Sequence, residues 1–251
     1  MYRNLVWVSL VFVGWLLSFR THAEEHFFDS DGVKIRYWTE GEGEPVLLIH
    51  GYTASGALNW GFPGILRNLA QEYRVIMPDV RGHGKSEAPE DGKHGVEVVR
   101  DMVRLLDHLG VERAHVVGYS MGGMITIKLA TMHPERMRSA LVGGMGWIPA
   151  GSEDAEGFSE RDGASERFTP ILRSFGEFAT TKEEMQALSM PIQVIVGTKD
   201  PGQMRRVALW KEIVPSLDVV YVDGATHAQC IFRPELKNGI SAFIGQHAGD
   251  D

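Results

Sequence analysis

The sequence predicts an α/β protein with a mostly parallel central sheet and helices on both of its faces. Short apolar runs suited to buried strands recur along the chain, and stretches with helical spacing separate most of them. Such an alternation of strand and helix favours a parallel sheet. The chain also has 251 residues, of which 43% are hydrophobic, and this is enough for one domain with a substantial core.

Six short apolar runs are the expected strands of this sheet. They are residues 46–49, 74–77, 115–117, 140–142, 192–196 and 219–222. Upstream, residues 33–39 alternate apolar and polar side chains and, together with residues 26–28, predict an antiparallel hairpin at one edge. Apolar residues with helical spacing follow the second run, at Val98, Met102 and Leu105, and similar spacing follows the third run.

Residues 147–190 interrupt the alternation, and we expect them to be a lid inserted into a single domain that spans residues 24–251. An ordinary surface excursion is the alternative. Residues 152–167 contain many acidic residues and glycines, and we expect them to bury too little apolar surface to be firmly ordered. Apolar residues at helical spacing then predict a short helix within 168–178. Trp147, Phe168 and Phe175 are our candidates for lining a substrate pocket.

The first 23 residues have the pattern of a secretory signal peptide. Arg3 precedes an apolar stretch at 5–17, and small residues at 21 and 23 suit cleavage before Glu24. The apolar stretch is shorter than the roughly 20 residues that span a bilayer. We therefore expect an exported protein, periplasmic or secreted, without stable membrane insertion; an uncleaved N-terminal anchor is the weaker alternative.

Charge and cysteine content exclude several classes of function. Lysine and arginine number 25 against 33 aspartate and glutamate, and no basic stripe is present, so we expect no nucleic-acid partner. Cys230 is the only cysteine, so no intramolecular disulfide can form. The glycines at 41 and 43 alternate with glutamates, and no lysine is placed to bind a phosphate, so we expect no phosphate-binding loop here. We expect neither a cofactor nor a metal.

The strongest chemical signal is the run Gly-Tyr-Ser-Met-Gly-Gly at 118–123, which follows an expected strand and opens an expected helix. This pattern is a nucleophile elbow, in which Ser120 lies on a sharp turn and glycine is needed at 118 and 122. The alternative is that Ser120 merely caps the helix.

A serine nucleophile needs a base and an acid, and two other strand ends supply candidates. His227 comes just after the expected strand at 219–222, and Asp200 comes just after the strand at 192–196. The order serine, aspartate, histidine is the one expected with this elbow. Residues 143–146, which follow the strand at 140–142, contain no competing acid.

Backbone amides are suited to stabilising the oxyanion of a tetrahedral intermediate. Met121, directly after the serine, offers one. The loop after the strand at 46–49 offers the other at Tyr52, which follows Gly51. In this loop we interpret His50 as a buried histidine satisfied by backbone hydrogen bonds rather than as a second base.

These motifs together resemble the α/β-hydrolase family, in its serine-nucleophile branch of esterases and lipases, from about Phe27 to Phe243. The His-Gly loop, the turn at 79–86, the elbow, the acid and the histidine occur in the family's order. In the family the turn at 79–86 is scaffold, so no catalytic role is carried over to Asp79, Arg81 or His83. The lid is shorter and more polar than is common in the family.

The resemblance implies a serine hydrolase that cleaves a carboxylic ester, or a similar small acyl substrate, through an acyl-enzyme. Serine at position 120 argues against the dehalogenases and epoxide hydrolases of this fold, which use aspartate. Acyl transfer or peracid formation on the same three residues stays open. A non-catalytic receptor that uses the hydrolase pocket is the non-enzyme alternative.

Overall fold

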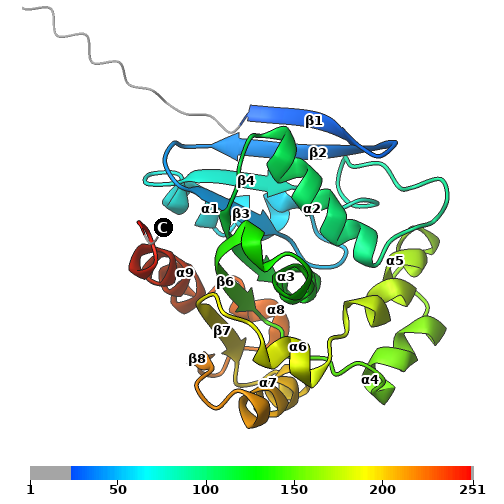
Figure 1. Ribbon diagram of the computed structural model, residues 1–251, viewed down its shortest axis with the longest axis vertical. Helices are drawn as coiled ribbons and strands as arrows, with labels where there is room; N and C mark the ends of the chain where they lie inside the picture. Colours follow the sequence, from blue (N-terminus) through cyan, green and yellow to red (C-terminus); the bar gives the residue numbers. More distant parts are fainter. Residues whose placement is uncertain (1–23, 250–251) are drawn as a thin grey trace, which may run out of the picture.

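The structure is a computed structural model that describes residues 24–249. Within that range, eight strands form one sheet in the order β1-β2-β4-β3-β5-β6-β7-β8, shown in Figure 1. The expected signal segment, residues 1–23, lies outside the described residues.

All six expected strands are present, and each runs parallel to its neighbours among them. They are β3 (Pro45–Ile49), β4 (Arg74–Pro78), β5 (Ala114–Tyr119), β6 (Met137–Gly143), β7 (Ile192–Gly197) and β8 (Asp218–Val222). The expected edge hairpin consists of β1 (Glu24–Ser30) and β2 (Val33–Glu40), and β2 pairs antiparallel with β4. Because the parallel strands share one direction, the loops after β3, β5, β7 and β8 meet at the same edge of the sheet, where catalytic groups gather in such folds.

Helices cover both faces of the sheet. Outside the insertion they are α1 (Ile65–Leu69), α2 (Val96–His108), α3 (Met121–Met132), α7 (Pro201–Ile213), α8 (His227–Cys230) and α9 (Pro234–Gln246). Leu47 and Ile49 of β3 join an apolar cluster with α2 and α3, whereas Val46 and Leu48 join a second cluster with α1 and α9. This alternation is what a strand buried on both faces requires. No helix among the described residues combines the length and apolar character needed to cross a membrane.

The insertion at 147–190 folds into short helical turns. They are α4 (Glu153–Glu156), α5 (Thr169–Arg173), α6 (Lys182–Gln186) and 3-10 turns at Gly157–Glu160, Glu166–Phe168 and Ser174–Phe178. The expectation that residues 152–167 are not firmly ordered stays a prediction, but the segment does make contacts with the rest of the protein. Phe158 is buried with its ring 5.4 Å from that of Phe175, and Asp154 pairs with Arg205 and Arg206 of α7. The apolar and charged partners come from outside the segment, so its own composition does not reveal them.

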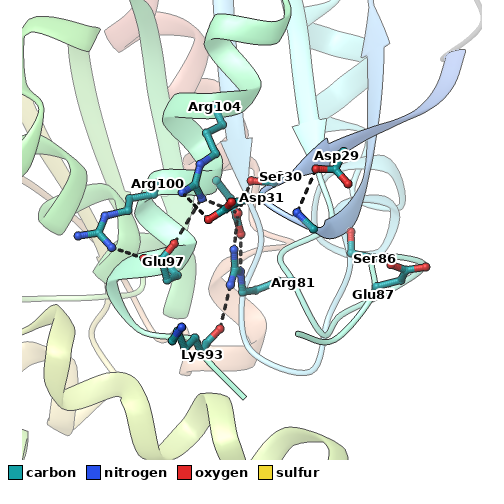
Figure 2. A network of polar contacts seen from close by, with 12 residues as sticks. Asp29, Ser30, Asp31, Arg81, Ser86, Glu87, Lys93, Glu97, Arg100 and Arg104 are labelled. Atoms are coloured by element: carbon teal, nitrogen blue, oxygen red, sulfur yellow. Dashed lines mark hydrogen bonds and ion pairs between the residues drawn. The ribbon is translucent and has the colours of Figure 1, made fainter. Parts of the chain in front are cut away.

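A buried ion pair ties the edge hairpin to the turn at 79–86 and to α2, and Figure 2 shows this network. Arg81 donates two hydrogen bonds of 2.6 Å to the carboxylate of Asp101, which also accepts one from Ser30. A further Arg81 nitrogen donates to the carbonyl oxygen of Lys93. Arg81 and Asp101 are both buried, so the turn at 79–86 is scaffold in this protein.

Candidate active site

The elbow holds Ser120 in a backbone conformation that non-glycine residues seldom adopt. Ser120 has φ 56° and lies between the end of β5 and the start of α3, and such strained residues cluster at functional sites. A Cβ atom at Gly118 would collide with the carbonyl oxygen of Gly122, and one at Gly122 would collide with that of Ile49. The Ser120 side chain makes no capping bond to α3. The hydroxyl is therefore presented at the edge of the sheet instead of serving the helix.

The structure brings Ser120, His227 and Asp200 together from three different loops. The Ser120 Oγ lies 2.9 Å from Nε2 of His227, and Nδ1 of His227 lies 2.6 Å from Oδ2 of Asp200. With Nδ1–H donating to the carboxylate, Nε2 is free to accept the serine proton. The other oxygen of Asp200 accepts the backbone N–H of Gln203 at the start of α7. The carboxylate is thus oriented by a helix start as well as by the imidazole.

Tyr119, which sequence reasoning did not single out, contacts His227 through both its hydroxyl and its ring. Its hydroxyl donates to the carbonyl oxygen of His227 at 2.5 Å, and its ring lies 5.7 Å from the imidazole. Burial raises the pKa of the Tyr119 phenol, so it stays a hydrogen-bond donor. Cβ atoms at Gly143 and Gly144 would lie 2.8 Å from the tyrosine ring. Tyr119 therefore occupies the space that an acid after β6 would need, in agreement with the absence of one from 143–146.

Both amides expected to bind an oxyanion are available. Among the described residues, no hydrogen bond occupies the N–H of Met121 or of Tyr52. His50 controls the peptide that carries the Tyr52 amide: its Nδ1–H donates to the carbonyl oxygen of Gly51 at 2.8 Å, and its Nε2 accepts the N–H of Val80 at 2.9 Å. The C=O and N–H of a trans peptide point in opposite directions. The Tyr52 N–H is therefore directed away from His50.

The partners of His50 require a neutral imidazole, since one ring nitrogen donates and the other accepts. Burial lowers the pKa of His50, and this keeps the required form. His50 is thus the backbone-satisfied histidine that we expected.

The three pocket candidates have different surroundings. Phe168 and Phe175 pack against the ring of Tyr52, with centroids 5.6 and 5.5 Å from it. Trp147 is buried and donates its indole N–H to Thr180 at the base of the insertion. Two of the candidates therefore pack against Tyr52 in the loop at 50–54, the oxyanion loop, and Trp147 anchors the lid.

Cys230 and the metal-ligating residue types offer no competing chemistry in the described part of the chain. Cys230 is fully buried, and burial raises the pKa of its thiol to about 11, so the reactive thiolate is scarce near neutral pH. Within residues 24–249, no group of three histidine, cysteine, aspartate or glutamate side chains is arranged to hold a metal ion.

Comparison with known proteins gives matches to hydrolases. The family model described as alpha/beta hydrolase fold matches residues 44–159. A 2-hydroxymuconate semialdehyde hydrolase of Pseudomonas putida is 39% identical over 133 residues, 51% of this chain and 47% of the relative. Haloalkane dehalogenase 2 of Mycobacterium tuberculosis is 32% identical over 139 residues, 54% of this chain and 47% of the relative.

One relative is named for acyl transfer. The dihydrolipoyllysine-residue acetyltransferase component of the acetoin cleaving system of Cupriavidus necator is 41% identical over 140 residues, which are 54% of this chain and 36% of the relative. The chain thus spans about half, or less, of the length of these curated relatives.

Solved structures share the fold over most of the chain. E-2-(acetamidomethylene)succinate hydrolase has a TM-score of 0.75 at 19% identity, covering 89% of this chain and 100% of that one. A meta-cleavage product hydrolase has a TM-score of 0.71 at 22% identity, covering 88% and 98%. The match to the family model, the sheet order and these structural likenesses together identify the chain as a protein of the α/β-hydrolase fold.

Proposed function

We propose that this protein is a serine hydrolase that cleaves a carboxylic ester, or a similar acyl substrate, through an acyl-enzyme on Ser120. The observation that carries this proposal is the continuous chain of hydrogen bonds from Ser120 Oγ through His227 to Asp200, at 2.9 and 2.6 Å. This is the arrangement by which a base and an acid activate a hydroxyl nucleophile.

In the proposed reaction, His227 takes the hydroxyl proton as Ser120 Oγ attacks the substrate carbonyl carbon. The carboxylate of Asp200 stabilises the imidazolium that forms, and the amides of Tyr52 and Met121 stabilise the oxyanion. His227 then protonates the leaving alkoxide, which departs and leaves the acyl group on Ser120. Water, activated by the same imidazole, attacks the acyl-enzyme and releases the acid.

The surface beside the triad supports a neutral, apolar ester as substrate. Leu58 is exposed in the helical turn at Ala57–Gly61, and Phe62 is exposed just after it. Phe232 is exposed shortly after α8, the helix that begins at His227. The rings of Phe62 and Phe232 lie 6.1 Å apart, so the two segments form one apolar rim. Exposed apolar clusters of this kind mark binding surfaces.

We expect a short acyl chain, because the cavity beside α3 is small. A cavity lined by Met124, Met145, Ile148 and Phe178 among others has a volume of about 10 Å³, which is about one water molecule. Met124 lies one helical turn beyond Ser120. An acyl group that enters here must be small, or the side chains around it must move.

The test is hydrolysis of p-nitrophenyl esters of increasing chain length by the wild type and by Ser120→Ala. We expect the substitution to lower kcat/KM by roughly 10³-fold or more while the protein stays folded. Ser159→Ala is the matched control, because Ser159 is an exposed lid residue whose hydroxyl donates to the carbonyl oxygen of Glu156. Activity of Ser120→Ala near that of the wild type would refute the proposal, and a preference for long acyl chains would refute the short pocket.

Two finer alternatives have support from the names of relatives. The acetyltransferase component of Cupriavidus necator favours acyl transfer, which uses the same acyl-enzyme with another acceptor than water. The Pseudomonas putida relative favours 2-hydroxymuconate semialdehyde as a substrate to include in the panel. Measuring how the acyl group partitions between water and an added alcohol separates hydrolase from transferase. No turnover of any of these compounds would favour the non-catalytic receptor.

We also propose that the protein is exported and that residues 1–23 are removed as a signal peptide. The support is the sequence pattern around the apolar stretch at 5–17. N-terminal sequencing of exported protein is expected to begin at Glu24. A sequence beginning at Met1 would favour the uncleaved anchor.

A further inference from the structure

A single π-helical turn, Ala57–Gly61, follows the oxyanion loop. Its defining bond runs from the N–H of Phe62 to the carbonyl oxygen of Ala57, at 2.9 Å. The start of the turn is fixed on the scaffold, because the N–H of Gly56 donates to the carboxylate of Asp79 at 3.0 Å. Isolated π-turns are rare and frequently occur at functional sites.

The turn places Asn59 against the oxyanion loop. Its Oδ1 accepts the backbone N–H of Gly51 at 2.5 Å. Gly51 in turn lies beside the nucleophile: a Cβ atom at position 51 would be 3.4 Å from Oδ1 of Asn59 and 3.4 Å from Cβ of Ser120. Asn59, Gly51 and Ser120 thus form one contact group, although the chain order separates them.

Asn59 and His50 together hold both sides of Gly51. Asn59 binds the N–H of Gly51, and the Nδ1–H of His50 binds its carbonyl oxygen at 2.8 Å. Glycine has more backbone freedom than any other residue, so both peptide planes must be held to fix its conformation. The second of these planes carries the N–H of Tyr52.

We propose that Asn59 is a positioning residue, which fixes Gly51 so that the Tyr52 N–H is held where an oxyanion forms. The inference rests on the proposed serine hydrolase function. Asn59 acts on the transition state through the backbone and needs no contact with the substrate. Loss of its acceptor leaves Gly51 held on the carbonyl side alone, and the Tyr52 amide then samples orientations that cannot donate to the oxyanion.

The experiment compares Asn59→Leu and Asn59→Ala, which remove the acceptor, with Asn59→Asp, which keeps one at the same length. Removal of an oxyanion donor costs about 10²- to 10³-fold in kcat, and misplacing one donor should cost about 10- to 100-fold. We expect this loss in kcat for the leucine and alanine variants, with KM changed by less than about threefold, because the amide acts in the transition state. Asn59→Asp should retain several-fold more activity than Asn59→Leu.

A second measurement reports on the oxyanion site itself. A trifluoromethyl ketone that matches the best ester forms a tetrahedral adduct on a serine nucleophile, and its inhibition constant should rise by about the factor by which kcat falls. Asn68→Ala is the matched control, since the side-chain amide of Asn68 donates to the hydroxyl of Ser241 in α9. The control should leave both quantities unchanged.

The outcomes separate this inference from the proposed function. If Ser120→Ala abolishes hydrolysis while all folded Asn59 variants keep kcat within about threefold of wild type, the positioning role is refuted and the hydrolase stands. A rise in KM alone would also refute it. If Asn59→Leu fails to fold, the alanine variant carries the same test.

Discussion

Each residue of the proposed triad is held by the backbone as well as by its side-chain partner. Ser120 is fixed by the strained elbow, Asp200 caps α7 through the N–H of Gln203, and the carbonyl oxygen of His227 receives the Tyr119 hydroxyl. Such second contacts hold a site in its productive geometry before the substrate arrives. Single substitutions in the triad should therefore remove chemistry without rearranging the loops.

Asp200→Asn provides a sharp test of the acid. An amide at this position no longer fixes the Nδ1–H tautomer of His227, so Nε2 loses its role as acceptor from Ser120. We expect kcat to fall by about 10⁴-fold with little change in unfolding temperature. Asp223→Asn is a matched control on an exposed loop, where the carboxylate of Asp223 accepts a hydrogen bond from the hydroxyl of Thr198. Retention of kcat within about tenfold of wild type would show that Asp200 is not the acid.

The sequence predicts the triad residues because each lies in a recognisable local motif in the loop or turn that follows a strand. Asn59 and Tyr119 have no such signal. The role of Asn59 depends on a π-turn that no residue spacing predicts. The role of Tyr119 depends on a contact with His227, which lies 108 residues later in the chain. Their roles arise from contacts that exist only once the sheet has assembled.

At the scale of elements, the lid is attached to the oxyanion loop. The hydroxyl of Tyr52 accepts the N–H of Ala164 at 3.3 Å and donates to the carbonyl oxygen of Phe168 at 3.1 Å. Arg167 donates to the carbonyl oxygen of Gly82 in the turn at 79–86. The lid and the oxyanion loop are thus one packed unit, which the polar composition of 152–167 did not predict.

Phe158→Ala tests whether this packing orders the lid. The change removes the ring that packs on Phe175, and loss of a buried phenylalanine costs about 3–5 kcal/mol in a well-packed core. We expect the cost to appear as local opening, because α4 and its neighbours can detach without unfolding the sheet. Trypsin should therefore cleave after the exposed Arg161 at least about fivefold faster. A cleavage rate equal to that of Ser159→Ala would contradict this expectation.

Asp101→Asn tests the buried ion pair between the turn at 79–86 and α2. The substitution leaves the Arg81 guanidinium buried without its carboxylate, and breaking a buried pair costs about 3–5 kcal/mol. We expect a loss of this size in the free energy of unfolding measured with urea. The control is Asp162→Asn, which breaks the exposed ion pair between Asp162 and Arg173 and should cost less than about 1 kcal/mol. Equal effects of the two substitutions would show that the pair is not a main support of the hairpin.

At the scale of the whole molecule, the alternation of strand and helix was sufficient to predict the sheet. Six apolar runs become six parallel strands, because a strand covered on both faces must be apolar at nearly every position. The register between strands and the packing of the insertion depend on long-range contacts and could not be predicted in this way. The fold also buries histidine side chains, and these make the free energy of unfolding depend on pH.

Three buried histidines near the turn at 79–86 make the fold sensitive to acid. Burial lowers the pKa of His83 to about 3 and that of His94 to about 4, and it also lowers the pKa of His50. In the unfolded chain these imidazoles titrate near 6.5, so the unfolded state binds more protons as the pH falls below that value. The stability that these neutral histidines contribute is therefore fully present above about pH 6.5. It is lost as the pH falls towards about 4 for His94 and about 3 for His83.

His94→Leu isolates one of these contributions. Nδ1 of His94 is buried without a partner among the described residues. Replacing His94 with leucine therefore removes a titrating group without breaking a hydrogen bond to Nδ1. We expect the free energy of unfolding, measured with urea between about pH 4.5 and 6.5, to depend on pH less steeply in this variant, by about one proton. His133→Leu, at a partly exposed position paired with Glu135, is the control. An unchanged slope for His94→Leu would show that the buried imidazole does not titrate on unfolding, and that the acid response of the fold has another source.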